Sequence, residues 1–545
     1  MKQIILKTSF TSGEVTSDLY GRGDLETYNN GAGKLINVNV LNTGGVIRRS
    51  GSVLLGELPT EARLINFSVQ EDDYLAVFHD RKVDIYKGKS KITQLITPFP
   101  KSKLKNLFFS ENNNSLWICS GDYPIKRISY QNNIFSIEDT NFSGFESNLF
   151  NSLSGYPKTI GFFQGRIVIA GTKEYPNRIW FSRSGSESDF SLGESLDDEG
   201  IDIKLLSTGN DFISNLYCSS YLILFTNSGE WIIEGSPITP NKILAKKYTT
   251  IGSPRNSNIN VVDTKDEVLF VNSDCNNIYS FKQNENMSLN YKACPIVSIS
   301  KHLTKDITDI AFSFKHNRLF CVKKDGTMAV LNNDYVEGVS AWSSYETDGQ
   351  YISVGTNKDY IYTVVKRAEQ YFLEVFSKEV LMDCCIIKKT EEPAFQFSGF
   401  DTFNGKKAML VADNILHKEV VVNNGIIDLN NKANKIFLGY KYKHTIKSLP
   451  LSSEQTGRKI RIRNITIRLK NTASLKIEVG GRKNTLSFQK FGQGILNKPI
   501  SLFSGDKSIS ILGWQNYSSD SLWNISGDSP LPITILSIKT DISIN

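Results

Sequence analysis

Hydrophobic and polar positions alternate in a regular way in the stretch YLILFTNSGEWIIEG at residues 221–235. Two apolar runs flank the short polar segment TNSG, and Gly229 can supply the positive φ that a tight turn needs. This spacing predicts a β-hairpin. Apolar side chains fall on both faces of its first strand, so we expect that strand to lie between two packed layers.

A four-residue apolar run of the same kind recurs through the first two thirds of the chain. The runs are LAVF at 75, LWIC at 116, IVIA at 167, LILF at 222, VLFV at 268, LFCV at 319 and IYTV at 361, and adjacent runs begin 41–55 residues apart. A polar turn and a second apolar segment follow each run. Repeated small sheets at this spacing predict a β-propeller of about seven blades, with six or eight as alternatives. Stacked β-sandwiches would give similar strands but no sustained period.

The period divides the chain into three parts. Residues 1–60 are rich in glycine and turn residues and lie outside the repeat, so we expect an N-terminal arm that closes the ring of blades or contacts another subunit. Residues 61–385 form the predicted propeller. The period ends there, and the shorter apolar runs of residues 386–545 predict a C-terminal β domain, sandwich-like or barrel-like, joined through residues 388–393. The fold class is therefore mainly β.

A basic strand is predicted late in the chain, at residues 457–470 (GRKIRIRNITIRLK). Arginines alternate with isoleucines up to Asn464, after which the phase shifts by one residue. A β-bulge at Asn464 would keep the isoleucines on the core side and the basic side chains outside. The basic face is interpreted in three ways: as a solvated sheet surface, as a subunit contact, or as a stripe making sequence-independent contacts with DNA phosphates.

Composition adds only a few constraints on the fold, the partners and the compartment of the protein. The chain has 545 residues, 40% of them hydrophobic, which is long enough for more than one domain with a large core. Its net charge of +7 permits contact with nucleic acid but does not require it. Seven cysteines without a CxxC pair indicate a reducing compartment rather than a disulfide framework. We find no apolar window long enough to span a membrane and no signal peptide.

Signals for enzymatic chemistry are weak. The five histidines are not spaced as metal ligands, and the chain contains no HExxH, GxSxG or P-loop motif. Acidic clusters at residues 71–73 and 197–199 lack the spacing of a calcium loop, and the polar segment 182–199 is expected to be a flexible loop. We therefore predict no catalytic residue, no metal site and no cofactor, and the sequence identifies no binding residues.

Three N-terminal motifs suggest a family. They are FxxGE at residues 10–14, GRxDL at 21–25 and GGxxRRxG at 44–51. With them, in order, come segments at 162–185, 225–240, 249–256, 301–312, 341–354, 457–469, 502–509 and 529–538. Together they resemble bacteriophage tail structural proteins of the nozzle or tail-tube type found in short-tailed phages. The resemblance covers nearly the whole chain, although Gly23 and the surface rich in lysine, asparagine and isoleucine depart from it.

The resemblance implies a non-enzymatic virion protein that is assembled in the host bacterial cytoplasm and located in the virion tail. It implies a homohexameric ring around the channel through which DNA is ejected, with the tail adaptor and the tail fibre or spike proteins as partners. Contact with double-stranded DNA would be transient and non-specific. Two alternatives are a polysaccharide depolymerase, which predicts clustered carboxylates with tyrosine or histidine at the propeller mouth, and a receptor-binding tail protein.

Overall fold

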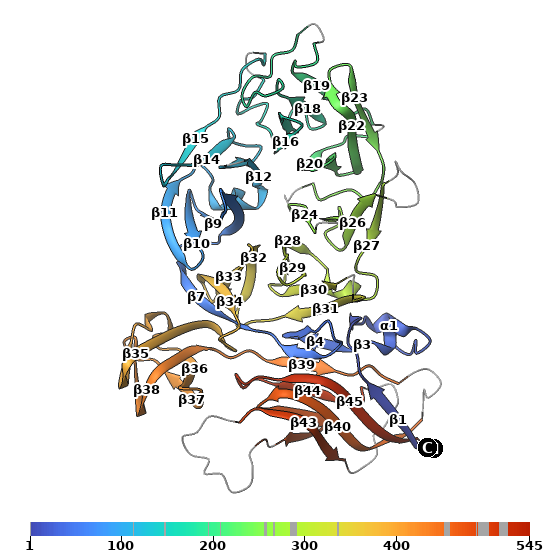
Figure 1. The fold of residues 1–545 in the computed structure, drawn as a ribbon, viewed down its shortest axis with the longest axis vertical. Helices are drawn as coiled ribbons and strands as arrows, with labels where there is room; N and C mark the ends of the chain where they lie inside the picture. Colours follow the sequence, from blue (N-terminus) through green and yellow to red (C-terminus); the bar gives the residue numbers. More distant parts are fainter. Residues whose placement is uncertain are drawn as a thin grey trace.

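A computed structural model describes residues 2–112, 114–146, 149–193, 196–207, 209–255, 259–264, 267–283, 291–334, 337–451, 458–486, 488, 501–511 and 521–544. β-Strands make up most of these residues, so the mainly-β class is confirmed (Figure 1). The described helices are all short: α1 (Glu26–Asn29) and the 3-10 helices η1 (Ser17–Leu19), η2 (Lys101–Asn106), η3 (Lys301–Leu303) and η4 (Asp401–Phe403). None of them has the length and apolar character needed to cross a bilayer.

Five four-stranded antiparallel sheets follow one another along the chain, each with its strands in sequence order. The first two are β8 (Arg63–Val69), β9 (Asp72–His79), β10 (Lys82–Lys87) and β11 (Ser90–Ile96), then β12 (Phe108–Asn112), β13 (Ser115–Cys119), β14 (Lys126–Gln131) and β15 (Ile134–Asp139). The next two are β16 (Thr159–Phe163), β17 (Arg166–Ala170), β18 (Arg178–Phe181) and β19 (Ile201–Lys204), then β20 (Ile213–Cys218), β21 (Leu222–Thr226), β22 (Gly229–Thr239) and β23 (Lys242–Lys247). The fifth is β24 (Val262–Asp263), β25 (Val268–Val271), β26 (Ile278–Gln283) and β27 (Tyr291–Pro295).

Two further repeat units have the same strand order but continue into larger sheets. One is β28 (Ile307–Ser313), β29 (Arg318–Lys323), β30 (Met328–Asp334) and β31 (Val339–Tyr345). The other is β32 (Gln350–Thr356), β33 (Ile361–Arg367), β34 (Gln370–Ser377) and β7 (Gly51–Leu58). All the units are arranged around a common centre, as in a β-propeller, with the inner strands facing one another (Figure 1).

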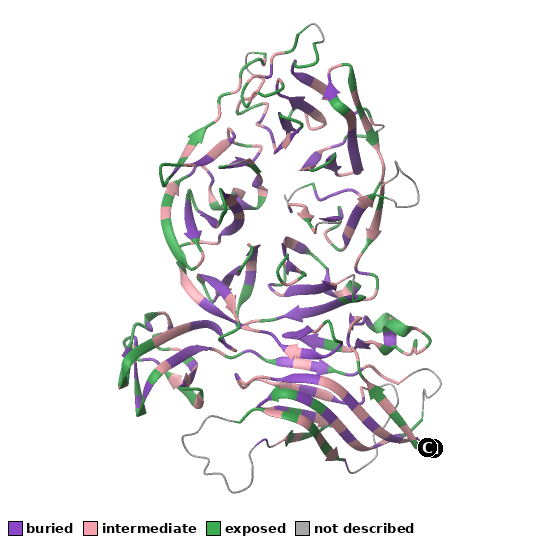
Figure 2. Ribbon diagram, viewed as in Figure 1, coloured by how far each residue is buried: buried purple, intermediate pink, exposed green. Residues whose placement is uncertain are grey.

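The apolar runs predicted from the sequence form the second strand of each unit. β21 is buried along its whole length and pairs with β22 through Thr226 and Gly229, as predicted for the hairpin. Outer strands such as β11 expose most of their side chains instead, and Figure 2 shows this gradient from the buried middle strands to the rim. Burial between neighbouring sheets explains why both faces of the second strands are apolar.

The N-terminal segment, expected to be an arm, contributes a strand to one of the repeat units. β7, within residues 1–60, pairs antiparallel with β34 from Gly51↔Ser377 to Leu58↔Tyr371, so part of this segment joins the repeat. Without β7, the backbone groups on that side of β34 would be an open sheet edge. Closing the ring was one of the two roles expected for residues 1–60, but the sequence did not identify β34 as the partner, because a strand pairing across more than 300 residues leaves no local signal.

The last two repeat units extend into the C-terminal part of the chain. The nine-stranded sheet continues from β31 through β4 (Lys34–Ile36), β39 (His444–Lys447), β44 (Asn524–Gly527), β41 (Leu475–Val479) and β42 (Arg482–Leu486). The eight-stranded sheet continues from β7 through β35 (Asp383–Ser398), β38 (Ile426–Tyr440), β36 (Lys407–Ala412) and β37 (Ile415–Val421). The expected junction at residues 388–393, and the expected boundary after residue 385, both lie inside the long strand β35.

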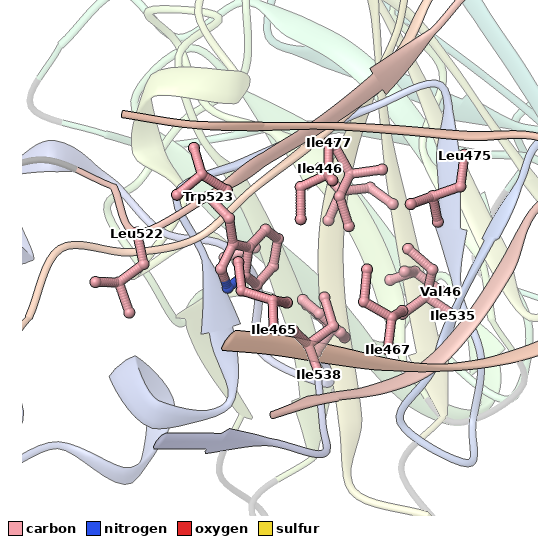
Figure 3. Close-up of a cluster of buried hydrophobic side chains, with 14 of the residues drawn as sticks. Val46, Ile446, Ile465, Ile467, Leu475, Ile477, Leu522, Trp523, Ile535 and Ile538 are labelled. Atoms are coloured by element: carbon pink, nitrogen blue, oxygen red, sulfur yellow. The ribbon is translucent and has the colours of Figure 1, made fainter. Parts of the chain in front are cut away.

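A third large sheet faces the C-terminal end of the nine-stranded sheet. It has the order β43 (Phe503–Ser510), β40 (Ile460–Thr472), β45 (Thr534–Ile544), β6 (Val46–Arg48) and β5 (Val38–Val40), and β1 (Lys2–Lys7) also pairs with β45. Isoleucines from both sheets, with Trp523, fill the space between them (Figure 3). A two-stranded pair, β2 (Gly13–Glu14) and β3 (Gly31–Ala32), lies nearby in the N-terminal segment.

A buried histidine in this region predicts how stability depends on pH. His444 is 2% exposed, and burial lowers the pKa of its imidazole to about 3. The unfolded chain therefore binds a proton below about pH 6.5 that the folded chain does not, and stability should fall on acidification by about 1.4 kcal/mol per pH unit. We expect His444→Gln to remove this loss between pH 6.5 and 4.5, as measured by urea unfolding.

His417→Gln is the matched control, because His417 lies partly exposed on β37. The control should keep the slope of the natural chain. An identical pH dependence in the natural chain and in His444→Gln would contradict the prediction.

Candidate functional site

The predicted basic strand is β40, and its register follows the prediction. Its isoleucines, from Ile460 to Ile467, are buried, whereas Arg461 is partly exposed and Arg468 is exposed. The pairing of β40 with β45 shifts between Ile462 and Asn464, which is the predicted β-bulge. The basic side chains therefore lie on the outer face of this sheet.

Part of that basic face is neutralised by neighbouring acids. Arg468 donates two hydrogen bonds to the carboxylate of Asp506, at 2.8 and 2.9 Å, and these bonds hold the pKa of Asp506 below its usual value. Within the described ranges, Arg461 and Arg463 form no ion pair. Arg461, Arg463 and the exposed Lys470 therefore remain on this face for an anionic partner.

The N-terminal strand β1 adds an apolar edge to the same outer face. Ile4 pairs with Asp541, and Asp541 pairs in turn with Asn464 of β40, so these side chains share a face. Ile4 and Leu6 are 61% and 62% exposed. Exposed apolar side chains on an edge strand favour association with another chain.

The GGxxRRxG motif at residues 44–51 forms a buried junction between distant parts of the chain. Nε of Arg49 donates to Oδ1 of Asn37 at 2.7 Å, and its two terminal nitrogens donate to the carboxylate of Asp383 at 2.8 and 2.7 Å. Nη2 also donates to the carbonyl of Glu346 at 2.9 Å, and the ring of Tyr442 lies 3.7 Å from the guanidinium carbon. Arg49 therefore joins the N-terminal segment, the repeat units and the C-terminal strands.

A second buried ion pair lies beside this junction. Arg367 contacts Glu374 at 3.1 Å, and both side chains are almost completely buried. Burial raises the pKa of Glu374. Burial also acts to raise the pKa of Asp383, but the charge and hydrogen bonds of Arg49, together with the charge of Arg367, lower it overall. These charged groups stabilise one another rather than forming an accessible reaction site.

The acidic clusters considered from the sequence are engaged in internal contacts. Asp72 pairs with Lys87 at 2.6 Å, and Asp198 pairs with Arg183 at 2.7 Å. Among the residues that the structure describes, no three His, Cys, Asp or Glu side chains form a group that could hold a metal ion. All seven cysteines are free thiols.

The segment 182–199, expected to be a flexible loop, is held by a buried arginine over the part of it that is described. Arg166 donates to the carbonyl oxygens of Ser182 at 2.7 Å and of Asp197 and Glu199 at 2.6 Å each. The Glu199 side chain is itself buried and accepts a hydrogen bond from the Leu196 amide. The sequence did not reveal these contacts, because Arg166 lies in a different strand, directly before the apolar run IVIA, and nothing local links it to residues 182–199.

A cavity of about 690 Å³ lies between the inner strands of five repeat units. Its wall comes from β8, β12, β24, β28 and β32, and includes Asn66, Asn260, Asp309 and the aromatic rings of Phe109, Phe312 and Phe314. Sequence reasoning missed this site because its residues come from five separate units and form no local motif.

Comparison with known proteins adds little to this picture. No family model and no curated protein matches the chain. Among solved structures, the β-propeller domain of Cps50 (Swd1) from Myceliophteria thermophila matches with a TM-score of 0.40 and 10% identity, over 60% of this chain and 100% of that one. The Neurospora crassa Pan2 WD40 domain matches with a TM-score of 0.37 and 12% identity, over 61% of this chain and 96% of that one. BBS1N, solved in complex with ARL6DN, matches with a TM-score of 0.35 and 10% identity, over 61% and 98% of the two chains.

Proposed function

We propose that this chain is a structural protein of a phage tail, a nozzle or tube subunit that forms a ring around the path of the ejected DNA. The observation that carries the proposal is the outer face of the third sheet, where an edge strand exposes Ile4 and Leu6 beside the arginines of β40. A surface of this kind suits repeated contacts between copies of one chain. A head-to-tail contact that closes on itself gives a ring.

The fold supports a mechanical role. We infer that the repeat units form a seven-bladed propeller closed by β7, and that the two facing C-terminal sheets form a β-sandwich. The motif at residues 44–51 fastens these parts together through Arg49 and Asp383. In the proposed hexamer, the C-terminal sheets contact neighbouring subunits and the tail adaptor, fibre or spike proteins attach around the ring. DNA contact is transient in this proposal, because a channel through which DNA slides cannot hold the phosphates tightly.

The depolymerase alternative requires carboxylates free to act as acid and base. Two carboxylates at the mouth of the cavity are instead held by neighbours: Asp73 accepts a hydrogen bond from the Ser68 hydroxyl, and Asp263 accepts one from Tyr217 at 2.8 Å. We therefore favour the structural role. Release of reducing ends from a host surface polysaccharide by the purified chain would contradict it.

Native mass spectrometry and electron microscopy of the purified chain test the ring directly. We expect a six-fold ring with a central hole, whereas a monomeric disc or a trimeric spike would contradict the proposal. Introducing Ile4→Glu and Leu6→Glu together should weaken the contact by about 30-fold or more, because burying two such side chains contributes about 2 kcal/mol or more. Larger assemblies should then dissociate into monomers at micromolar concentration.

The control for this variant is Ile96→Glu. Ile96 is 79% exposed on β11, at the rim of the repeat units and outside the third sheet. It should leave the ring intact. Rings that survive the β1 substitutions unchanged would show that β1 is not the contact.

A further inference from the structure

We propose that the cavity between the inner strands binds a neutral, polyhydroxylated small molecule about the size of a disaccharide. The inference does not depend on ring assembly, because the cavity lies within one chain. Its volume of about 690 Å³ falls within the usual range for small-molecule sites, about 300–1,000 Å³. A water-filled channel could have the same volume, so we infer the class of ligand from the residues that line the wall.

Two asparagines in the wall have polar atoms without partners. Nδ2 and Oδ1 of Asn66 and Oδ1 of Asn260 are shielded from solvent, and in the part of the chain that the structure describes none of the three forms a hydrogen bond. A buried amide left without a partner is unfavourable, so it needs an explanation, and a molecule bound in the cavity supplies one. Because Asn66 offers one donor and one acceptor, a hydroxyl group, which can both accept and donate, satisfies it well.

The charged groups around the cavity are already engaged within the protein. Deep in the wall, Asp309 accepts a hydrogen bond from Ser353 at 2.6 Å and Arg63 donates to the carbonyl of Lys105 at 3.0 Å. At the mouth, Lys315 pairs with Asp359 and Lys358 pairs with Asp73. The unsatisfied groups are therefore the neutral amides, and a neutral ligand fits them better than an anion or a cation.

Aromatic side chains supply the second half of the recognition. Phe312 and Phe314 lie edge to face with their ring centroids 5.2 Å apart, and Phe314 is 46% exposed although it lines the cavity. An accessible ring beside hydrogen-bonding amides suits a molecule with apolar C–H faces and hydroxyl edges. A sugar has both.

Titration calorimetry of the full chain with single probes tests the inference. We would use maltose, lactose and cellobiose as neutral disaccharides, with glucose 6-phosphate and spermidine as charged probes. At least one neutral disaccharide should bind with a Kd of about 1 mM or below, and Asn66→Leu should weaken it at least about tenfold. Preferential binding of a charged probe, or no binding of any neutral one at about 50 mM, would overturn the proposal.

Asn434→Ala is the matched control, because Asn434 is an exposed asparagine on β38, outside the cavity. It should bind the disaccharide as the natural chain does. Equal loss of binding in both variants would overturn the assignment to the cavity.

A second measurement separates a binding amide from a structural one. Asn66→Leu preserves the shape of the side chain and removes the unpartnered polar atoms, so it should raise the Tm of the ligand-free protein by about 1–3 °C. A lower Tm would mean that the amide is satisfied in the folded protein without a ligand, which overturns the proposal.

Discussion

Replacing Arg49 with methionine should lower the free energy of unfolding by about 3–5 kcal/mol. The Arg49 side chain is fully buried and that of Asp383 is 2% exposed, so the substitution leaves a carboxylate buried without its countercharge. The pKa of Asp383, which Arg49 now holds below its usual value, should then rise. Urea unfolding at pH 7 measures the loss, and Asp383→Asn should cause a loss of similar size.

The matched control is the surface pair of Arg22 and Asp24. These side chains also form a close ion pair, at 2.7 Å, but they are 53% and 62% exposed. Replacing Arg22 with methionine should change stability by no more than about 1 kcal/mol, because water and salt screen the interaction. Equal losses of unfolding free energy in Arg49→Met and Arg22→Met would contradict the stabilising role assigned to the buried junction.

Gly51→Ala should destabilise the protein by about 3 kcal/mol or more, from the addition of a single methyl group. A Cβ at this position would lie 2.0 Å from the carbonyl oxygen of Met382 and 2.6 Å from its amide nitrogen. Both are backbone atoms, so β7 would have to move away from the segment that leads into β35. The expected result is a large fall in the urea midpoint, with loss of protection from hydrogen exchange in β7 and β34.

Gly56 provides the control within the same strand. A Cβ there would meet only the hydroxyl of Tyr86, at 3.9 Å, and nothing nearer. Gly56→Ala should therefore be neutral or slightly stabilising, because alanine restricts the unfolded chain. A loss of stability equal to that of Gly51→Ala would show that glycine is needed throughout β7 for some reason other than close packing.

Local patterns in the sequence predicted the features that depend on local burial. The hairpin of β21 and β22, the apolar second strands and the bulge at Asn464 were all predictable, because alternating burial leaves its mark on neighbouring positions. Motif reasoning also singled out residues 44–51, although no local pattern explained the two arginines. In the structure, Arg49 contacts a carboxylate 334 residues away.

Long-range pairings could not be predicted in the same way. The partner of β7, the continuation of β31 into β4, and the inward-facing Asn66 each depend on which strands meet in space. The expectation of a flexible loop at residues 182–199 was misleading for a related reason. Its polar composition is that of a solvated loop, yet its backbone carbonyls are bound by Arg166.

The continuity of the two large sheets has a mechanical consequence. The first passes from the repeat units into the C-terminal part through one residue pair, Ser344↔Ile36, and the second passes through one pair, Cys385↔Val53. Side-chain contacts reinforce these narrow bridges: Asn332 in the repeat units donates to the carbonyl of Val40 in the third sheet at 2.8 Å, and Arg49 donates to the carbonyl of Glu346 at 2.9 Å. A load applied to one lobe is therefore passed to the other through several elements at once, and the seam resists bending.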